Sequence, residues 1–286
     1  MAPAVAVRMD GETARLALAC LHAELLLYPK PGLVSPVDNG SHTDMNAATF
    51  MRSLLSLRHY FAAICRAGAA DAPFAELRQL GVLAERRMLL ATGGINTHRG
   101  AIFCLGLLCA AHGRLRAQGQ AVDAAALRAT LLRCWGGALA AHASVISSAA
   151  TTTGPASHGA LVAHRHAAAG AREEAALGLP SVFEVGLPAL HGALRAGRPM
   201  QAARTDALFA LMAHISDTNV LYRGGAGGAA LVRRTARAFI DAGGTAHPDW
   251  LASAVAAHRS FVRRRLSPGG AADLLAATCF VHAVLP

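Results

Sequence analysis

The chain has 286 residues, 53% of them hydrophobic, and a formal net charge of +10. This length can bury a full core, which we expect to be one domain spanning 1–286. Alanine and leucine dominate over β-branched and aromatic residues, which favours an all-α fold and argues against a β-rich one. The positive charge indicates an anionic partner, such as nucleic acid, a membrane surface or a polyphosphate substrate.

The cysteines and the apolar segments indicate the cellular compartment. The six cysteines form no C-x-x-C pair and lie mostly in apolar helical patterns, as is typical of reduced core cysteines. The N-terminus lacks the apolar segment of a signal peptide, and the longest stretch without an acidic residue, lysine or arginine, 134–164, is a poor membrane span. We therefore expect a soluble cytoplasmic protein.

Apolar residues recur at helical spacing through most of the chain. The pattern predicts helices over 14–27, 44–68, 73–91, 100–112, 123–142, 159–177, 199–215, 226–241, 248–266 and 271–284. The low-complexity segment from Ser144 to Ser157 is typical of a flexible loop, and no strand pair or internal repeat occurs. We expect a compact multi-helix bundle whose active site is formed by interhelical loops.

The first loop contains Lys30, the only lysine of the chain, between Pro29 and Pro31 in "LYPKPGLVSPVDNGSHTDM". The two prolines stiffen the backbone on either side of it. A stiffly held ammonium is a compact charge with three donors, suited to a phosphate or a reacting oxygen. We expect Lys30 in a site loop rather than in the core; the alternative is a solvated surface lysine. Glu24, on the preceding helix, is either buried with a partner, at the rim of a pocket, or a charge at the edge of the apolar stripe.

Acidic and histidine side chains follow Lys30 closely. Asp38, His42 and Asp44 fall within seven residues, and oxygen ligands from a short loop suit Mg²⁺. Each acid also has a structural explanation. Asp38 suits an Asp-Asn-Gly turn, and "SHTD" reads as a capping box with Ser41 as N-cap and Asp44 three residues on.

Two later loops lead into helix starts, where free backbone N–H groups and the helix dipole attract phosphate. The segment "GGINTHRG" lacks the Walker A ending but contains Asn96, His98 and Arg99. The segment "RGGAGGAA" is not preceded by a strand, so a dinucleotide fold is rejected. We expect it to hold an anion through Arg223, Gly224 and Gly225, beside Asp217 and Asn219.

Five segments taken in order resemble the triphosphoribosyl-dephospho-CoA synthase family: "PKPGLV…NGSHTDM", "ATGGINTHRGAIF", "GAREEAALGLPSV", "DTNVLYRGG" and "SPGGAADLLA". The resemblance implies an all-helical enzyme that joins ATP to 3′-dephospho-CoA and releases adenine. The product would be the precursor of the prosthetic group of malonate decarboxylase or citrate lyase, passed to a holo-acyl-carrier-protein synthase. The first segment looks more like the malonate decarboxylase branch.

Two positions depart from the family pattern. Ser35 stands where an acid often follows "PGLV", and "GARGEA" reads "GAREEA", so that Glu174 carries the match. With the residues above, the resemblance implies Asp44 as the catalytic base, together with Lys30 and His42. The implied phosphate and ribose ligands are Asn96, His98, Arg99, Asn219, Arg223, Gly224 and Gly225. The implied Mg²⁺ ligands or their supports are Glu24, Asp38 and Asp217, and Arg172 and Glu174 would line or brace the site.

Two other classes of protein remain open. A Mg²⁺-dependent helical nucleotide or ADP-ribose hydrolase would use the same acids with water as the nucleophile. A basic helical nucleic-acid-binding protein would show a basic stripe, whereas here the arginines are scattered and carboxylates accompany the polar clusters. We therefore expect no nucleic-acid and no membrane partner. The oligomeric state stays open, a homo-oligomer included.

Overall fold

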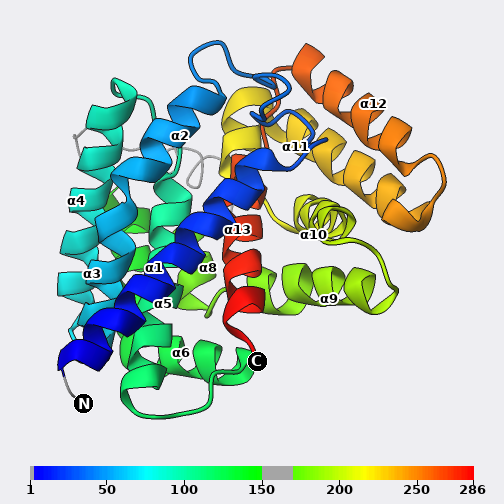
Figure 1. Cartoon of the computed structure of the whole chain (residues 1–286). Helices are drawn as coiled ribbons and strands as arrows, with labels where there is room; N and C mark the ends of the chain where they lie inside the picture. The colour runs from blue at the N-terminus through cyan, green and yellow to red at the C-terminus, as the bar shows by residue number, and fades with distance from the viewer. Residues whose placement is uncertain (1–2, 150–169) are drawn as a thin grey trace.

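The computed structural model describes residues 3–149 and 170–286, and these ranges contain helices and no strand (Figure 1). The elements are α1 (Pro3–Leu26), α2 (Ala47–Ser56), α3 (Arg58–Ala69), α4 (Phe74–Thr92), α5 (Arg99–Ala117), α6 (Ala124–Ala149), α8 (Ala171–Ala176), the π-helical η1 (Ser181–Gly186), α9 (Leu187–Arg195), α10 (Met200–His214), α11 (Thr218–Asp241), the 3₁₀ turn η2 (Gly244–Ala246), α12 (Trp250–Arg263) and α13 (Gly269–Val284). The expectation of an all-α fold is confirmed.

The helix expected over 44–68 is in fact two helices. Asn46 caps α2 through a reciprocal bond with Thr49, and the helix ends before Leu57. The hydroxyl of Ser56 donates to the carbonyl of Ser53 at 2.6 Å and so competes with the helical backbone bonds at this end. The capping box predicted for Ser41 and Asp44 is therefore wrong, because the helix begins at Ala47.

Other boundaries also differ from the expectation, and the first helix, expected from Ala14, begins at Pro3. The loop expected from Ser144 begins as helix, because α6 continues to Ala149; its remainder lies outside the described residues, as does most of the helix expected over 159–177. A helical segment over 181–195, formed by η1 and α9, was not predicted. The helix expected from Ala226 starts at Thr218 and has a non-helical kink at Gly225.

Helix α5 is the centre of the first half of the chain. Almost every residue from Ala101 to Leu115 is buried, because α1, α3, α6 and α13 pack around it. The closest approach is to α3, where a Cβ on Gly68 would lie 2.1 Å from the carbonyl oxygen of Ala110. All six cysteines are free thiols.

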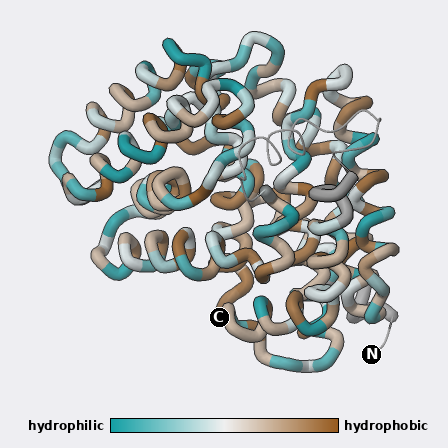
Figure 2. The backbone as a smooth tube through the Cα atoms, turned by 180° about the vertical axis from the view of Figure 1, so that it is seen from behind, coloured by the Kyte–Doolittle hydropathy of each residue, from teal (hydrophilic) through white to brown (hydrophobic). Residues whose placement is uncertain are grey.

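Helix α13 joins this half to the second half, which contains α9 to α12 (Figure 1). It contacts α1 and α5 on one side and α10 and η1 on the other. Hydrophilic and hydrophobic stretches alternate along most helices in Figure 2, as expected for helices with one buried face. None of the described helices is long and apolar enough to cross a bilayer.

Candidate active site

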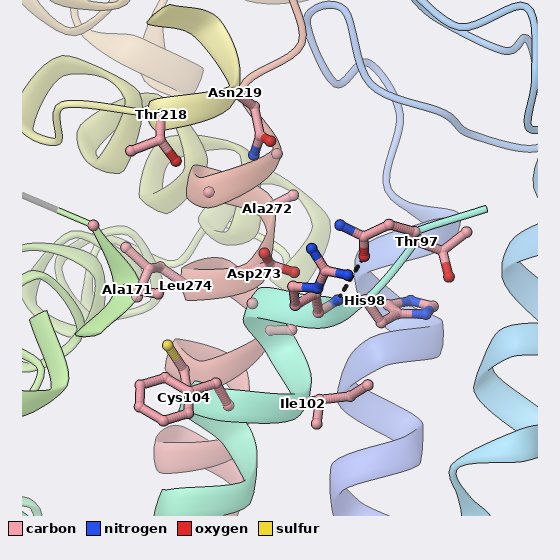
Figure 3. Close-up of a pocket in the computed structure, with 18 of the residues that line it drawn as sticks. Thr97, His98, Ile102, Cys104, Ala171, Thr218, Asn219, Ala272, Asp273 and Leu274 are labelled. Carbon is pink, nitrogen blue, oxygen red and sulfur yellow. Dashed lines mark hydrogen bonds between the residues drawn. The ribbon is translucent and has the colours of Figure 1, made fainter. Parts of the chain in front are cut away.

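A cavity of about 1720 Å³ opens where the two halves meet. Its wall is formed by the loop after α1, one face of α4, and the starts of α5, α8, α11 and α13. Figure 3 shows part of this wall, with Asp273 projecting from α13 toward the start of α5. The predicted location of the site, in loops between helices, agrees with the position of this cavity.

The starts of α11 and α13 are held together by one carboxylate, that of Asp217. Its Oδ1 accepts the backbone N–H of Asn219 at 2.9 Å and that of Val220 at 3.3 Å, which caps α11. Its Oδ2 accepts the backbone N–H of Ala271 at 3.1 Å, in the first turn of α13. The helix start predicted at "RGGAGGAA" to hold an anion is not a helix start, because this segment lies within α11, which begins at Thr218. Burial raises the pKa of Asp217, while these backbone bonds oppose the rise.

The start of α5 approaches α13 in the same way. A Cβ on Gly100 would lie 2.1 Å from Oδ2 of Asp273, so only glycine permits this contact. The carboxyl group of Asp273 faces the cavity and accepts a bond from the backbone of Ala101. Burial, and then the charges of Glu24 and Asp217, raise its pKa well above the ordinary value. Three acids thus approach one another at the inner end of the cavity.

Lys30 lies against these acids. Its Nζ is 2.6 Å from Oε1 of Glu24, and its side chain is only 1% exposed. Burial lowers the pKa of Lys30, and the charge of Glu24 opposes this change. Both residues line the cavity. The expectation that Lys30 lies in a loop is confirmed, but the expectation that it lies outside the core is wrong, because its side chain is buried against Glu24.

His42 and Arg223 form a second polar group on the wall. Nη2 of Arg223 donates to Nδ1 of His42 at 3.0 Å, so the proton of the neutral ring is on Nε2, which lies 2.8 Å from Oγ of Ser267. Burial, and then the guanidinium of Arg223, lower the pKa of His42 to about 4. Asp44 Oδ1 is 3.6 Å from the same Nδ1, and its side chain is 57% exposed. Asp44 is therefore a solvated carboxylate at the cavity edge.

His98 is buried at the start of α5 and has one nitrogen, Nε2, without a hydrogen-bond partner among the described residues. Its Nδ1 lies 2.6 Å from Oγ of Ser53, which also accepts the hydroxyl proton of Thr97 at 2.7 Å. Ser53 and Thr97 therefore hold the ring through Nδ1 and leave Nε2 as the nitrogen that can bond a bound molecule. Burial, and then the charge of Lys30, lower the pKa of His98 to about 3, so the ring is neutral.

The outer part of the cavity carries three arginines. Arg99 forms an ion pair with Glu85 across the gap between α5 and α4. Arg78, from α4, and Arg172, from α8, line the cavity near it. Burial lowers the pKa of Arg172; the neighbouring Glu173 raises it, and Arg78 lowers it further.

Most of the predicted site residues meet at this cavity. Those that line it are Glu24, Lys30, His42, Asp44, Asn96, His98, Arg99, Arg172, Glu174, Asp217, Asn219 and Arg223. Asn96 accepts the backbone N–H of Arg99 at 3.2 Å, and Glu174 accepts the backbone N–H of Ser181 at 2.7 Å. These two residues therefore also brace the loops that form the wall.

Three predicted residues do not line the cavity. Asp38 accepts the N–H of Gly40 at 2.8 Å and pairs with Nε2 of His258 at 3.1 Å, which makes it a turn residue, not a group facing the cavity. Gly224 packs against Leu266, where a Cβ would come within 2.4 Å of Cδ2. Gly225 has a φ of +59° and produces the kink in α11. The structure thus explains both glycines through packing and backbone conformation.

Two residues on the cavity were missed by sequence reasoning. Asp273 lies within the segment "SPGGAADLLA" that carried part of the resemblance, yet nothing in its spacing pairs it with Glu24, 249 positions earlier. Arg78 looks like any solvated arginine on an amphipathic helix. It reaches the cavity only because α4 lies beside the starts of α5 and α8 in the fold.

The charge of the lining bears on metal binding. It includes seven acids, Glu24, Asp44, Glu85, Glu173, Glu174, Asp217 and Asp273, against five cations, Lys30, Arg78, Arg99, Arg172 and Arg223. In the described part of the chain, no three His, Cys, Asp or Glu side chains gather tightly enough to hold a metal ion by themselves. Carboxylates at the wall of an acidic cavity fit Mg²⁺ that enters with substrate phosphates and takes only one or two protein ligands.

Comparisons with known proteins show the family of this chain. A family model described as ATP:dephospho-CoA triphosphoribosyl transferase matches residues 10–285. A protein of Acinetobacter calcoaceticus named probable 2-(5″-triphosphoribosyl)-3′-dephosphocoenzyme-A synthase is 38% identical over 276 residues, which cover 96% of this chain and 90% of the relative. The resemblance carried by the five segments is thereby confirmed.

Two further relatives carry the name of the same synthase. The 2-(5″-triphosphoribosyl)-3′-dephosphocoenzyme-A synthase of Pectobacterium atrosepticum is 40% identical, over 92% of this chain and 85% of its own length. A probable synthase of the same name from Stutzerimonas stutzeri is 40% identical, over 100% of this chain and 94% of its own length. No solved structure gives a significant match.

Proposed function

The chain belongs to the ATP:dephospho-CoA triphosphoribosyl transferase family, and we propose that the cavity between its two halves is where the transfer takes place. Family membership makes the protein a ribosyl-transferring enzyme with triphosphoribosyl-dephospho-CoA synthase activity. The observation that carries the proposal is the meeting of Lys30, His98, Arg223 and the carboxyl group of Asp273 on one wall.

The transfer exchanges one bond at the ribose of ATP for another. The 2′-hydroxyl oxygen of dephospho-CoA bonds to C1″ while the bond from C1″ to N9 of adenine breaks, and all three phosphates stay on the ribose. The proton that the hydroxyl loses balances the proton that the departing adenine takes up. Positive charge develops on the ribose during this exchange, as in glycoside cleavage. Carboxylates near C1″ therefore stabilise the transition state.

The residues of the wall suit these roles. Asp44, a solvated carboxylate at the cavity edge, is the proposed base for the 2′-hydroxyl. Arg223 and Lys30 supply positive charge toward the phosphates. The Nε2 atom of the neutral His98 ring is engaged by no described residue, so it can form a hydrogen bond with the substrate. Asn219 lies at the start of α11, where it can orient the ribose.

Mg²⁺ is the proposed metal ion, brought in with the triphosphate. Glu24 uses only one oxygen to pair with Lys30, and Asp273 has no ion pair with a described residue, so these two side chains are the proposed ligands. Asp217 is assigned to helix capping and Asp38 to its turn. The ion would neutralise charge on the triphosphate beside the acidic inner wall.

The product would serve as the precursor of the prosthetic group of an acyl carrier protein. We favour malonate decarboxylase over citrate lyase as the destination, on the first loop segment alone. In either pathway, a holo-acyl-carrier-protein synthase would be the next enzyme.

One incubation tests the activity. The protein is mixed with Mg²⁺, dephospho-CoA and ATP labelled on the γ-phosphate, and the products are identified by mass and by label. We expect free adenine in step with the loss of dephospho-CoA, and the label in the enlarged CoA derivative. Stoichiometric release of ADP, AMP, phosphate or pyrophosphate without adenine would instead indicate a phosphohydrolase or kinase. Free ribose triphosphate formed without dephospho-CoA would favour the hydrolase.

A further inference from the structure

Three arginines from three different elements meet at the outer part of the cavity. Arg78 comes from α4, Arg99 from the first position of α5 and Arg172 from α8. His142, on α6, lies beside them, and both Arg172 and Arg78 lower its pKa. We call Arg78, Arg99 and Arg172 the arginine rim.

The arginine rim is only partly neutralised. Arg99 pairs with Glu85, and Glu173 lies near Arg172, whereas Arg78 forms no ion pair with a described residue. Arg78 and Arg99 both act to lower the pKa of Arg172, so the guanidinium groups are close enough to repel one another. Like charges held together at a cavity wall favour a bound anion, and a guanidinium binds phosphate oxygens bidentately.

The inner end of the cavity has the opposite balance. Glu24, Asp217 and Asp273 line it, against the cation Lys30. Glu174 belongs to this end too, since its charge and that of Asp273 both raise the pKa of Cys104. A polyphosphate can bind beside this many acids only with a divalent cation between them. The arginine rim needs no such ion.

The two substrates differ in the same respect. ATP carries a triphosphate that takes Mg²⁺, whereas dephospho-CoA carries a diphosphate between its adenosine and its pantetheine arm. We infer that the arginine rim is the binding site for the diphosphate of dephospho-CoA, and that the acidic inner end takes the triphosphate with its metal ion. This inference rests on the proposed function for the identity of the two substrates.

The test compares two arginines of the same helix. Arg78→Gln removes the charge of the rim residue that has no ion pair. Arg87→Gln, also exposed on α4 but away from the cavity, is the matched control. The dissociation constants of dephospho-CoA and of ATP with Mg²⁺ are measured separately by calorimetry for wild type and both variants. Circular dichroism verifies that the folds are equal.

We expect Arg78→Gln to weaken dephospho-CoA binding by about tenfold or more, the effect of losing a charge-assisted contact. ATP binding should change less than about twofold, and Arg87→Gln should change neither constant. Pyrophosphate without metal should compete with dephospho-CoA in wild type and compete less in Arg78→Gln.

Other results overturn the inference. If ATP binding weakens instead, the rim holds the triphosphate; if both constants change equally or neither changes, the rim does not distinguish the substrates. Because binding is measured apart from turnover, the two proposals can fail separately. Tight, Arg78-dependent binding of dephospho-CoA without adenine release would uphold the rim and reject the transfer. A wild type that binds no dephospho-CoA would reject both.

Discussion

Nζ of Lys30 and Oε1 of Glu24 lie 2.6 Å apart at the cavity wall, and both side chains are almost entirely buried. A pair of this kind gains little net stability, because each charge has lost its water, but removing one partner leaves the other charge buried alone. The pair therefore matters for both folding and binding, and the two effects can be separated by mutation.

Lys30→Met should lower the free energy of unfolding by about 3–5 kcal/mol, because Glu24 is left unpaired. The double variant Glu24→Gln/Lys30→Met should regain most of this loss but no activity. Lys30→Arg keeps the positive charge but places a larger guanidinium where the smaller ammonium group lies. It should lower the free energy of unfolding by about 1–3 kcal/mol and remove most of the turnover. Urea unfolding and adenine release measure the two properties. Wild-type turnover in Lys30→Arg would contradict a special role for this lysine.

Asp44→Asn should abolish most activity without affecting the fold. Asn46 caps α2 and the side chain of Asp44 is solvated, so stability should change by less than about 0.5 kcal/mol. If Asp44 is the base, turnover should fall by roughly a hundredfold or more. Asn46→Ala is the converse control, with an expected loss of about 1 kcal/mol in the stability of the fold. Near-normal turnover in Asp44→Asn would place the base elsewhere.

Asp217→Asn should weaken the joint between α11 and α13. One amide oxygen cannot accept bonds from both helix starts, so a buried N–H is left unpaired, at a cost of about 1–3 kcal/mol. Asp249 precedes α12 but makes no capping bond with its side chain, so Asp249→Asn should be nearly neutral. Equal unfolding midpoints for the two variants would rule out the double cap.

Gly100→Ala should displace Asp273, since the added methyl group would overlap its carboxyl oxygen. We expect a loss of about 1–3 kcal/mol from overpacking and a large fall in turnover. Gly137→Ala, in the interior of α6 with open space around it, should instead raise stability by up to about 1 kcal/mol. Unaltered turnover in Gly100→Ala would remove Asp273 from the reaction.

The stability of the protein should fall as the medium becomes acidic. The pKa of His98 is about 3 and that of His112 about 4, both below the ordinary 6.5, because the rings are buried. The folded state binds fewer protons on them, so their contribution is complete above pH 6.5 and is lost as pH falls toward 4. Asp217 and Asp273, with raised pKa values, act in the opposite sense.

A variant isolates the histidine contribution. His112 bonds to Thr13 at 3.0 Å and does not line the cavity. In His112→Gln, the fall of the unfolding free energy between pH 6.5 and 4 should be shallower than in wild type. An unchanged slope would show that His112 titrates normally in the folded protein.

The sequence predicted the helices well where apolar spacing was long and regular, as in α5 and α10. It could not show the break at Leu57, because no glycine or proline stands there and Leu57 itself keeps near-helical dihedral angles. The π-helical turn before α9 also has no periodic signal. These local deviations are set by tertiary packing rather than by propensity.

The sequence predicted those site residues that a short segment singles out, and missed those that only the folded chain brings to the cavity. Lys30 stood out by its uniqueness among arginines, and its loop position followed from two prolines. Its burial against Glu24 depends on how the loop turns back onto α1. Asp273 and Arg78 depend on helices that come together only in the fold, so neither could be told from an ordinary helix residue.

The volume of the cavity has a consequence for the order of events. At about 1720 Å³ it exceeds the roughly 300–1,000 Å³ of a site for one small molecule. Both substrates can therefore occupy it together, which permits the ribose to pass directly from adenine to its acceptor without first being attached to the protein. Such a single displacement inverts the configuration at C1″. Double-reciprocal plots of the initial rate against one substrate, at several concentrations of the other, would then intersect rather than run parallel. Adenine would not leave until dephospho-CoA has arrived.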